Sequence, residues 1–197
     1  MHKMLLMKDI IQDGHPLLRK RATEVKLPLG NDDLATLRDM MAFVKNSQDP
    51  ELIEKYGLRP SVGLAAPQIA IAKKMFCVHT WDESGATLHS FALVNPRIVA
   101  FSEEQTYLPG GEGCLSVDQD TLGLVPRASR IKVKAHVVDL DSGNASPAFL
   151  KFSGYVGIVV QHEYDHLLGT LFIDKVKPSL PNLKPIVFQD EIKERTA

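Results

Sequence analysis

The segment from Gln161 to His166 constrains this chain most, because it sets two imidazoles four residues apart with a carboxylate beside the first. On an α-helix of about 3.6 residues per turn, His162 and His166 lie on one face, where both rings can reach one metal ion. Glu163 is then free to act as a base in a hydrolytic site. The alternative is a core helix with two hydrogen-bonded histidines. Both readings predict a buried helix.

Two histidines leave a metal site incomplete, because a catalytic site usually takes three protein ligands and keeps one position open for water. One peptidase pattern continues with a third histidine six residues after the second, but this chain reaches Gly169 and then places Phe172 there. Other peptidases take a glutamate from a later helix. The candidates Asp190, Glu191 and Glu194 follow several prolines, which disfavour a helix packed against the first.

A better third ligand is Cys114, which follows a glycine-rich stretch beginning at Pro109. Glycines allow the backbone to adopt positive φ angles and to approach a ligand closely. A thiolate beside two imidazoles suits a borderline divalent metal, and the cation would keep the sulfur deprotonated. The alternative is that Cys114 is a small buried hydrophobic residue, which is a common environment for a free cysteine.

A third segment, from Ser61 to Gln68, is by itself an apolar loop with one amide. Together with the other two segments it is much more specific. S-V-G-L-A-A-P-Q, E-G-C-L-S and Q-H-E-Y-D-H, in this order, resemble the three signature motifs of the peptide deformylases. These metal hydrolases remove the formyl group from N-formylmethionine on new polypeptides. The resemblance also includes Asp13–Arg19 and the loop Leu108–Asp118, so it spans nearly the whole chain.

The first motif departs from the commonest form of the family, which opens with glycine where this chain has Ser61. The preceding Arg59 and Pro60, and the long insert between Asn46 and Leu58, resemble the class II bacterial enzymes. We therefore expect Ser61 to mark a subclass.

The resemblance implies a role for each residue of the site. The metal ligands would be Cys114, His162 and His166, with ferrous iron as the ion in the cell, although a thiolate and two imidazoles also suit zinc, nickel or cobalt. Glu163 would act first as a base and then as an acid. The Leu115 N–H and the Gln68 side-chain amide would be the catalytic donors to the developing oxyanion.

The same resemblance predicts the residues that bind the substrate and those that support the ligands. The expected substrate-binding residues are Val62, Gly63, Leu64, Gly113, Tyr155, Ile158 and Val159, four of which (Val62, Tyr155, Ile158 and Val159) would line a methionine pocket. Glu112 and Arg127 would pair to hold the cysteine loop, with two solvated surface charges as the alternative. Asp165 would either orient an imidazole or lie on the solvated side of the helix.

Composition bounds the remaining properties. The 197 residues suit one domain, and 44% hydrophobic residues indicate a globular protein. A formal charge of −1 argues against dedicated nucleic-acid binding. Cys77 and Cys114 form no disulfide framework, and the apolar piece Met4–Met7 is too short for a membrane span. We therefore expect a cytoplasmic protein that acts on N-formylmethionyl nascent polypeptides and contacts the ribosome transiently.

Hydrophobic spacing predicts an α+β fold, a single domain over 1–197 with small, mostly antiparallel sheets around the central helix that carries the HExxH motif. We expect a helix that Asn31 or Asp32 caps and that ends near Asn46. The expected strands are Lys74–His79, Ala92–Val99 and Ile131–Asp139, and the expected central helix is Gly154–Leu168 with Gly169 as its stop. We expect Lys175–Ala197 to be mostly a solvated terminus.

Two other functions are compatible with these motifs. A zinc metallopeptidase of the HExxH type would need a ligand other than Cys114. A non-catalytic domain with a closed structural site would need Cys77 as the fourth ligand.

Overall fold

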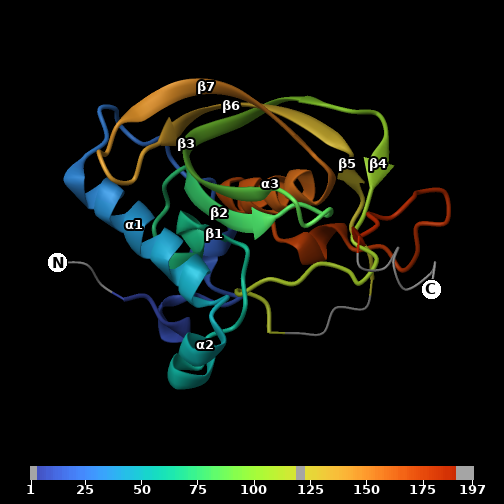
Figure 1. Cartoon of the computed structure of the whole chain (residues 1–197), viewed down its shortest axis with the longest axis horizontal. Helices are drawn as coiled ribbons and strands as arrows, with labels where there is room; N and C mark the ends of the chain where they lie inside the picture. Colours follow the sequence, from blue (N-terminus) through green and yellow to red (C-terminus); the bar gives the residue numbers. More distant parts are fainter. Residues whose placement is uncertain (1–3, 119–122, 190–197) are drawn as a thin grey trace.

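The computed structural model describes residues 4–118 and 123–189 and shows an α+β fold in which a curved antiparallel sheet surrounds a central helix (Figure 1). The predicted fold class is confirmed. The main sheet has the strand order β1 (Gly63–Ala65), β2 (Met75–Trp81), β3 (Leu88–Phe101), β6 (Arg130–Val138), β7 (Ala145–Ser153). Strands β4 (Gln105–Thr106) and β5 (Arg127–Ala128) form a second, small sheet.

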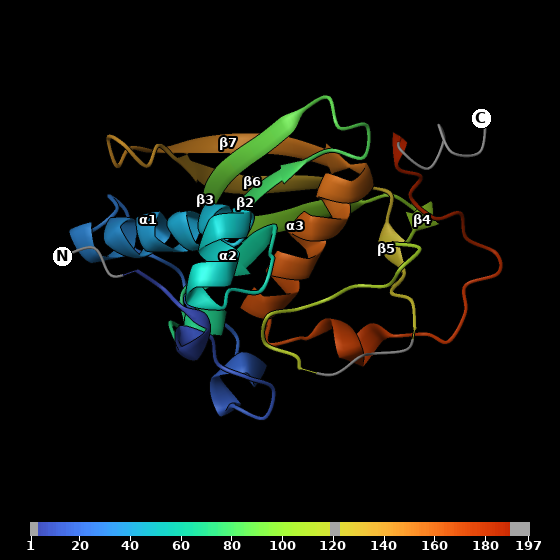
Figure 2. The ribbon, with the colours of Figure 1, turned by 60° about the horizontal axis from the view of Figure 1, so that its bottom comes forward.

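The central helix is α3 (Gly154–Leu167), and ten of its fourteen residues are buried. Its run of β-branched residues favours a strand on propensity alone. Packing decides otherwise, because Val156, Val159 and Val160 belong to one core cluster with residues of β2, β3 and β6. Figure 2 shows α3 lying against the sheet. The helix ends as predicted, with Gly169 at φ +76° just beyond its C-terminus. No helix among the described residues is both long and apolar enough to cross a membrane.

Helix α1 (Asn31–Asn46) packs on the opposite face of the sheet. Side chains alternate between faces along a strand, so Met75 of β2 contacts the α1 side while Phe76 contacts the α3 side. The expected cap was wrong: Gly30 is the N-cap and makes no side-chain bond. Asp32 and Asp33 lie in the first turn instead, where their negative charges interact favourably with the positive end of the helix dipole.

Local pattern also missed several elements. Helix α2 (Pro50–Tyr56) occupies the insert and is capped by Asp49, and strand β7 follows β6 after a short turn. The predicted strands are confirmed, with ends that differ by a few residues. Residues 175–189 are mostly exposed, as predicted for the tail, but the segment is also tied to the rest of the fold. Among its contacts, Ile186 N–H donates to the Tyr107 carbonyl at 2.9 Å, and the Phe188 ring packs edge-on against Tyr155.

The N-terminus of α3 is capped from a distant part of the chain. Ser153 makes no side-chain cap bond. The Tyr155 N–H donates instead to the carboxylate of Glu83, in the hairpin between β2 and β3, at 3.0 Å. A carboxylate at this position accepts a hydrogen bond from an N–H that has no partner within the helix, and its negative charge interacts favourably with the helix dipole. The β2–β3 hairpin therefore helps to define where the central helix begins.

We predict that Glu83→Ala will lower the free energy of unfolding by about 0.5–2 kcal/mol, the usual cost of losing a helix cap. Glu83→Gln keeps an acceptor oxygen and should lose less. Urea titrations of both variants measure the effect, and Glu103→Ala, an exposed acidic residue between β3 and β4, is the control. Equal stability of Glu83→Ala and Glu103→Ala would contradict the capping role.

Candidate metal centre and active site

The fold brings together the three predicted metal ligands. His162 and His166 project from α3, and Cys114 lies on the loop that passes beside it. The Cys114 Sγ is 3.4 Å from the His166 Nε2, and one ligand atom from each of the three residues lies within 4.8 Å of the others. This is the donor set of a compact site for a single ion.

The surroundings of these donors fit a catalytic metal. The His162 Nδ1 is 2.8 Å from a Glu112 oxygen, so its other ring nitrogen remains for a metal. The Glu163 Oε2 is buried and has no hydrogen-bond partner among the described residues. A buried carboxylate oxygen without a partner is costly. Its position beside three donors indicates a place for water and for a polar substrate group.

A closed structural site that uses Cys77 is contradicted. Cys77 is fully buried in the core, where its Sγ lies 3.5 Å from the Leu37 carbonyl, and the metal-ligand group of the described residues does not include it. Phe172, where one peptidase pattern needs a histidine, packs its ring against His162 with centroids 5.9 Å apart. The alternative ligands Asp190, Glu191 and Glu194 lie outside the described residues.

A buried guanidinium connects the cysteine loop to the helix. Arg127 of β5 donates to both oxygens of Glu112 at 2.7 and 2.8 Å, and to Asp165 of α3 at 2.6 Å. Both residues of the Glu112 pair are almost fully buried, so the alternative of two solvated charges is wrong. Because Glu112 also contacts His162, Arg127 and Glu112 together orient one candidate metal ligand and the loop that carries another.

Asp165 matches neither of its expected environments. It is buried rather than solvated, and its side chain forms no hydrogen bond to a histidine among the described residues. Its carboxylate accepts from Arg127 and from Lys175, at 2.6 Å in each case. Asp165 therefore acts on the site through Arg127, and it also ties the segment after α3 to the helix.

Electrostatics separates the two carboxylates of the site. Burial raises the pKa of Glu163 to about 7, and the charge of Glu112 adds to the increase. Burial would also raise the pKa of Glu112, but the hydrogen bonds from Arg127 and His162 outweigh it and lower that pKa to about 2. Glu163 can therefore exchange a proton near neutral pH, while Glu112 stays ionised.

Gly63 is the glycine that the site requires. A Cβ atom added to Gly63 would lie 2.5 Å from the Glu163 carboxylate, which is closer than any real contact. The hydroxyl of Ser61 donates to the Gly63 carbonyl at 2.5 Å. The serine that replaces the family's usual glycine therefore binds its own loop. The backbone passes close to Glu163 at Gly63 and not at Ser61, so the serine does not crowd this carboxylate.

The amide of Gln68 is held in a defined orientation. Its Oε1 accepts from the Ala65 N–H at 3.0 Å. Its Nε2 therefore points toward the Cys114 Sγ at 3.5 Å and the Ser116 hydroxyl at 3.3 Å. The amide thereby presents a donor to the candidate ligand Cys114.

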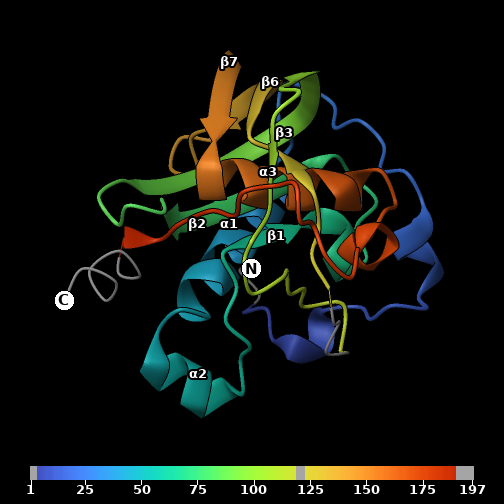
Figure 3. The same ribbon diagram turned by 90° about the vertical axis from the view of Figure 1, so that its right-hand side faces the viewer.

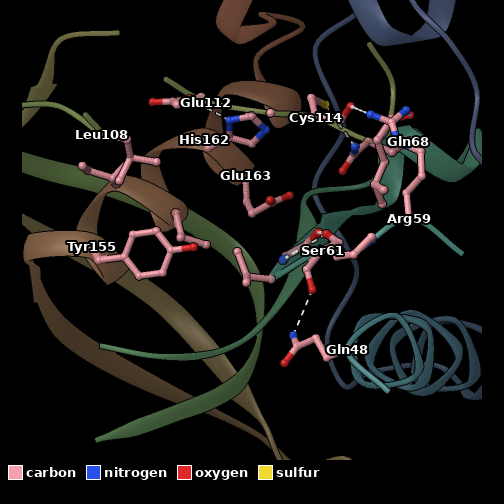
Figure 4. Close-up of a pocket in the computed structure, with 17 residues that line it drawn as sticks. Gln48, Arg59, Ser61, Gln68, Leu108, Glu112, Cys114, Tyr155, His162 and Glu163 are labelled. Carbon is pink, nitrogen blue, oxygen red and sulfur yellow. Dashed lines mark hydrogen bonds and ion pairs between the residues drawn. The ribbon is translucent and has the colours of Figure 1, made fainter. Parts of the chain in front are cut away.

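A cavity of about 320 Å³ opens beside these groups (Figure 4). Its lining includes most of the residues predicted to contact substrate or reacting atoms: Val62, Gly63, Gln68, Gly113, Leu115, Tyr155, Ile158, Val159 and Glu163. Leu64 is not among them, because its side chain is fully buried in the core beneath α1. Its backbone belongs to β1, an edge strand of the main sheet.

The cavity also contains residues that sequence reasoning did not assign to the site. Gln48, Leu108 and Arg59 line it. The Arg59 guanidinium donates to the carbonyls of Cys114 and Leu115 at 3.2 and 3.4 Å. It thus holds the peptide unit that joins these two residues. Arg59 was noted only as a subclass mark, because a contact made more than fifty residues away leaves no local pattern.

Comparison with known proteins agrees with this geometry. The family model of polypeptide deformylase matches residues 7–182. Peptide deformylase 2 of Bacillus cereus is 52% identical over 182 residues, which is 92% of this chain and 96% of that protein. Peptide deformylase 2 of Geobacillus stearothermophilus is 51% identical over 178 residues, covering 90% of this chain and 94% of that protein.

Solved structures show the same likeness. A class I type b peptide deformylase from Acinetobacter baumannii, with Met-Ala-Ser bound, matches with a TM-score of 0.65 at 30% identity, over 89% of this chain and 100% of that one. The peptide deformylase of Thermotoga maritima matches with a TM-score of 0.62 at 32% identity, over 86% of this chain and 97% of that one.

Glu112→Gln should destabilise the metal-free protein at neutral pH, because breaking a buried ion pair typically costs about 3–5 kcal/mol. The pKa of Glu112 is about 2 in the folded protein, against an ordinary value of 4.5. Its charge therefore stabilises the fold above pH 4.5, and this contribution is lost as the pH falls toward 2. In urea titrations the gap between wild type and variant should shrink over that range.

Glu104→Gln is the matched control, because Glu104 pairs with Arg130 at 3.3 Å on the surface. Exposed ion pairs contribute only about 0–1 kcal/mol. Equal losses in the two variants, or a gap that stays constant as the solution is acidified, would refute the buried-pair account.

Proposed function

Because the chain belongs to the polypeptide deformylase family and so removes the N-formyl group from new polypeptides, we propose that Cys114, His162 and His166 form its catalytic centre. The observation that carries this proposal is the meeting of three metal donors and the unpartnered Glu163 carboxylate at one cavity. We further propose that residues 1–197 work as one catalytic domain.

The family is metal-dependent, and we propose that the three donors hold one divalent ion. When bound, such an ion supplies positive charge for the reacting carbonyl and lowers the pKa of a water from about 15.7 toward about 7. One thiolate and two imidazoles suit iron, cobalt, nickel or zinc. We propose Fe2+ as the ion in the cell, from the resemblance of the three motifs, and Zn2+, Ni2+ or Co2+ as ions that a purified sample can hold.

Glu163 is the proposed proton carrier. Its pKa of about 7 lets the carboxylate take a proton from the attacking water and return it to the departing amine at neutral pH. Its position supports this role, because the carboxylate lies beside His162 and projects toward the cavity (Figure 4). The close passage of Gly63 leaves the side chain little freedom to turn away.

The oxyanion that develops on the formyl group needs fixed donors. We propose the Leu115 N–H and the Gln68 amide for this role. The bond from Ala65 supports the assignment of Gln68, since it leaves the Nε2 as the group facing the cluster. The contact of Arg59 with the Cys114 carbonyl supports the assignment of the Leu115 N–H, because this carbonyl and the Leu115 N–H belong to one peptide unit.

The substrate backbone is proposed to extend along β1. Strand β1 lies at the edge of the sheet, so one side of its backbone is available for an added strand formed by the peptide. Val62, Leu64 and Gly113 would pair with this backbone, and Val62, Tyr155, Ile158 and Val159 would surround the methionine side chain. The bound Met-Ala-Ser in the Acinetobacter baumannii structure supports a peptide that begins with methionine.

The place of action follows from the substrate. We propose that the protein works in the cytoplasm and contacts the ribosome transiently, because formylated chains are available while they are being made. The family relationship supports this proposal.

We predict that Glu163→Gln will keep the bound metal and lose about 100-fold to 10,000-fold in deformylation rate, the usual contribution of a general acid-base group. Formate release from formyl-Met-Ala-Ser and metal content per protein measure the two properties. Glu103→Gln, on the surface, is the control. A Glu163→Gln rate within a few-fold of wild type would remove Glu163 from the mechanism.

The site should also distinguish formyl from acetyl groups. The additional methyl of an acetyl group must fit between Gly63, Leu115 and Gln68, and a displacement of about 1 Å can cost about 100-fold in rate. The side-chain pocket should tolerate more, since one methylene changes binding by only about 1–3 kcal/mol. Formyl-norleucine peptides should react well and acetyl-Met peptides hardly at all. Similar rates for formyl-Met and acetyl-Met would indicate a broader amidase.

A further inference from the structure

The outer face of the main sheet carries an unusual charge distribution. Strands β3, β6 and β7 together contain five lysines and arginines and no aspartate or glutamate. The five are Arg97, Arg130, Lys132, Lys134 and Lys151, and all are exposed. The residues of β6 that alternate with these cations face α3 and the core. The cations therefore share the face of these strands that is turned away from α3, and Figure 3 shows α3 against the other face.

Strand pairing sets these cations directly beside each other. Arg97 is opposite Lys134, and Lys132 is opposite Lys151. None of these four forms an ion pair with a carboxylate in the part of the chain that the structure describes, whereas Arg130 pairs with Glu104. Like charges directly opposite on a sheet destabilise it. A bound anion would remove that cost, which is the first indication that this face has an anionic partner.

The shape of the face gives a second, independent indication. A hollow of about 400 Å³ lies over the ends of the strands. Its lining combines the cations Arg130, Lys132 and Lys151 with the small residues Ala100, Ser102 and Ser153 and the apolar residues Phe101, Ile131 and Phe152. Three cations at one hollow can contact the phosphate groups of a bound polyanion. Beside Lys134, the ring of Phe149 is 53% exposed, and an exposed ring next to cations offers a stacking surface for a base.

The net charge of −1 conceals this segregation. The chain has 23 lysines and arginines and 24 aspartates and glutamates. With five of the cations and none of the anions in these three strands, the remainder of the chain is acidic. A polyanion would therefore be attracted to one face and repelled elsewhere, which orients the protein as it binds.

We propose that the outer face of β3, β6 and β7 binds RNA, through phosphate contacts with Arg97, Lys132, Lys134 and Lys151 and base stacking on Phe149. The choice of RNA over another polyanion rests on the proposed function, because the substrate emerges from a particle whose surface is largely RNA. The active-site cavity is lined by α3 on the opposite face of the sheet. Its mouth stays open while the outer face is bound.

The test compares two triple variants that lose the same charge. Lys132→Gln, Lys134→Gln and Lys151→Gln alter the proposed face, and Lys8→Gln, Lys26→Gln and Lys55→Gln alter exposed lysines elsewhere. Fluorescence anisotropy with a labelled single-stranded RNA of about 20 nucleotides, longer than most single-strand sites, gives the affinity over a range of salt concentrations. Cosedimentation with salt-washed bacterial ribosomes and with phosphatidylglycerol vesicles compares the polyanions.

The face variant should bind RNA at least about tenfold more weakly at about 0.1 M salt, with a salt slope lower by about 2, since each phosphate contact contributes about 0.7. Phe149→Ala should weaken binding without changing the slope. Equal loss in both triple variants, or preferential binding to vesicles, would overturn the proposal. Both triple variants should deformylate formyl-Met-Ala-Ser at the wild-type rate. Absence of that activity in every protein would count against the proposed function and leave the RNA result standing.

Discussion

The arrangement of the site depends on one buried guanidinium. Arg127 comes from a two-residue strand, Glu112 from the cysteine loop and Asp165 from the central helix. Taking an arginine out of water is costly unless every donor finds a partner, so the folded chain must bring both carboxylates to it. This requirement fixes the loop against the helix. Cys114, on the loop, is consequently held beside the two histidines of the helix.

Burial acts in opposite ways on two neighbouring carboxylates. Glu112 is buried with a full set of partners, which lowers its pKa to about 2. Glu163 is buried with one oxygen unpartnered, and its pKa rises to about 7. When their environments move two pKa values apart, two carboxyl groups can have different chemical roles at the same pH. One becomes a permanent charge that orients His162, and the other becomes a group able to exchange protons.

Local pattern predicted the parts of the fold and site that depend on spacing. The central helix, its stop at Gly169 and the metal-ligand group were all predicted from short motifs, and the structure brings these ligands together. Contacts between distant segments left no such signal, as Glu83 capping α3 and Arg59 holding the cysteine loop show. The net charge left no such signal either, because a sum over the chain does not say which strands carry the cations. The class II assignment stays a prediction.

The most direct test of the three-donor centre is X-ray absorption spectroscopy of the zinc-loaded, full-length protein. We expect one sulfur at about 2.3 Å and two imidazole nitrogens at about 2.0–2.1 Å, with the remaining position taken by oxygen from solvent. Loading formyl-Met-Ala-Ser, or its product Met-Ala-Ser with formate, should alter only the oxygen contribution. Two sulfurs, which would place Cys77 beside Cys114, or a shell without sulfur, would contradict the account.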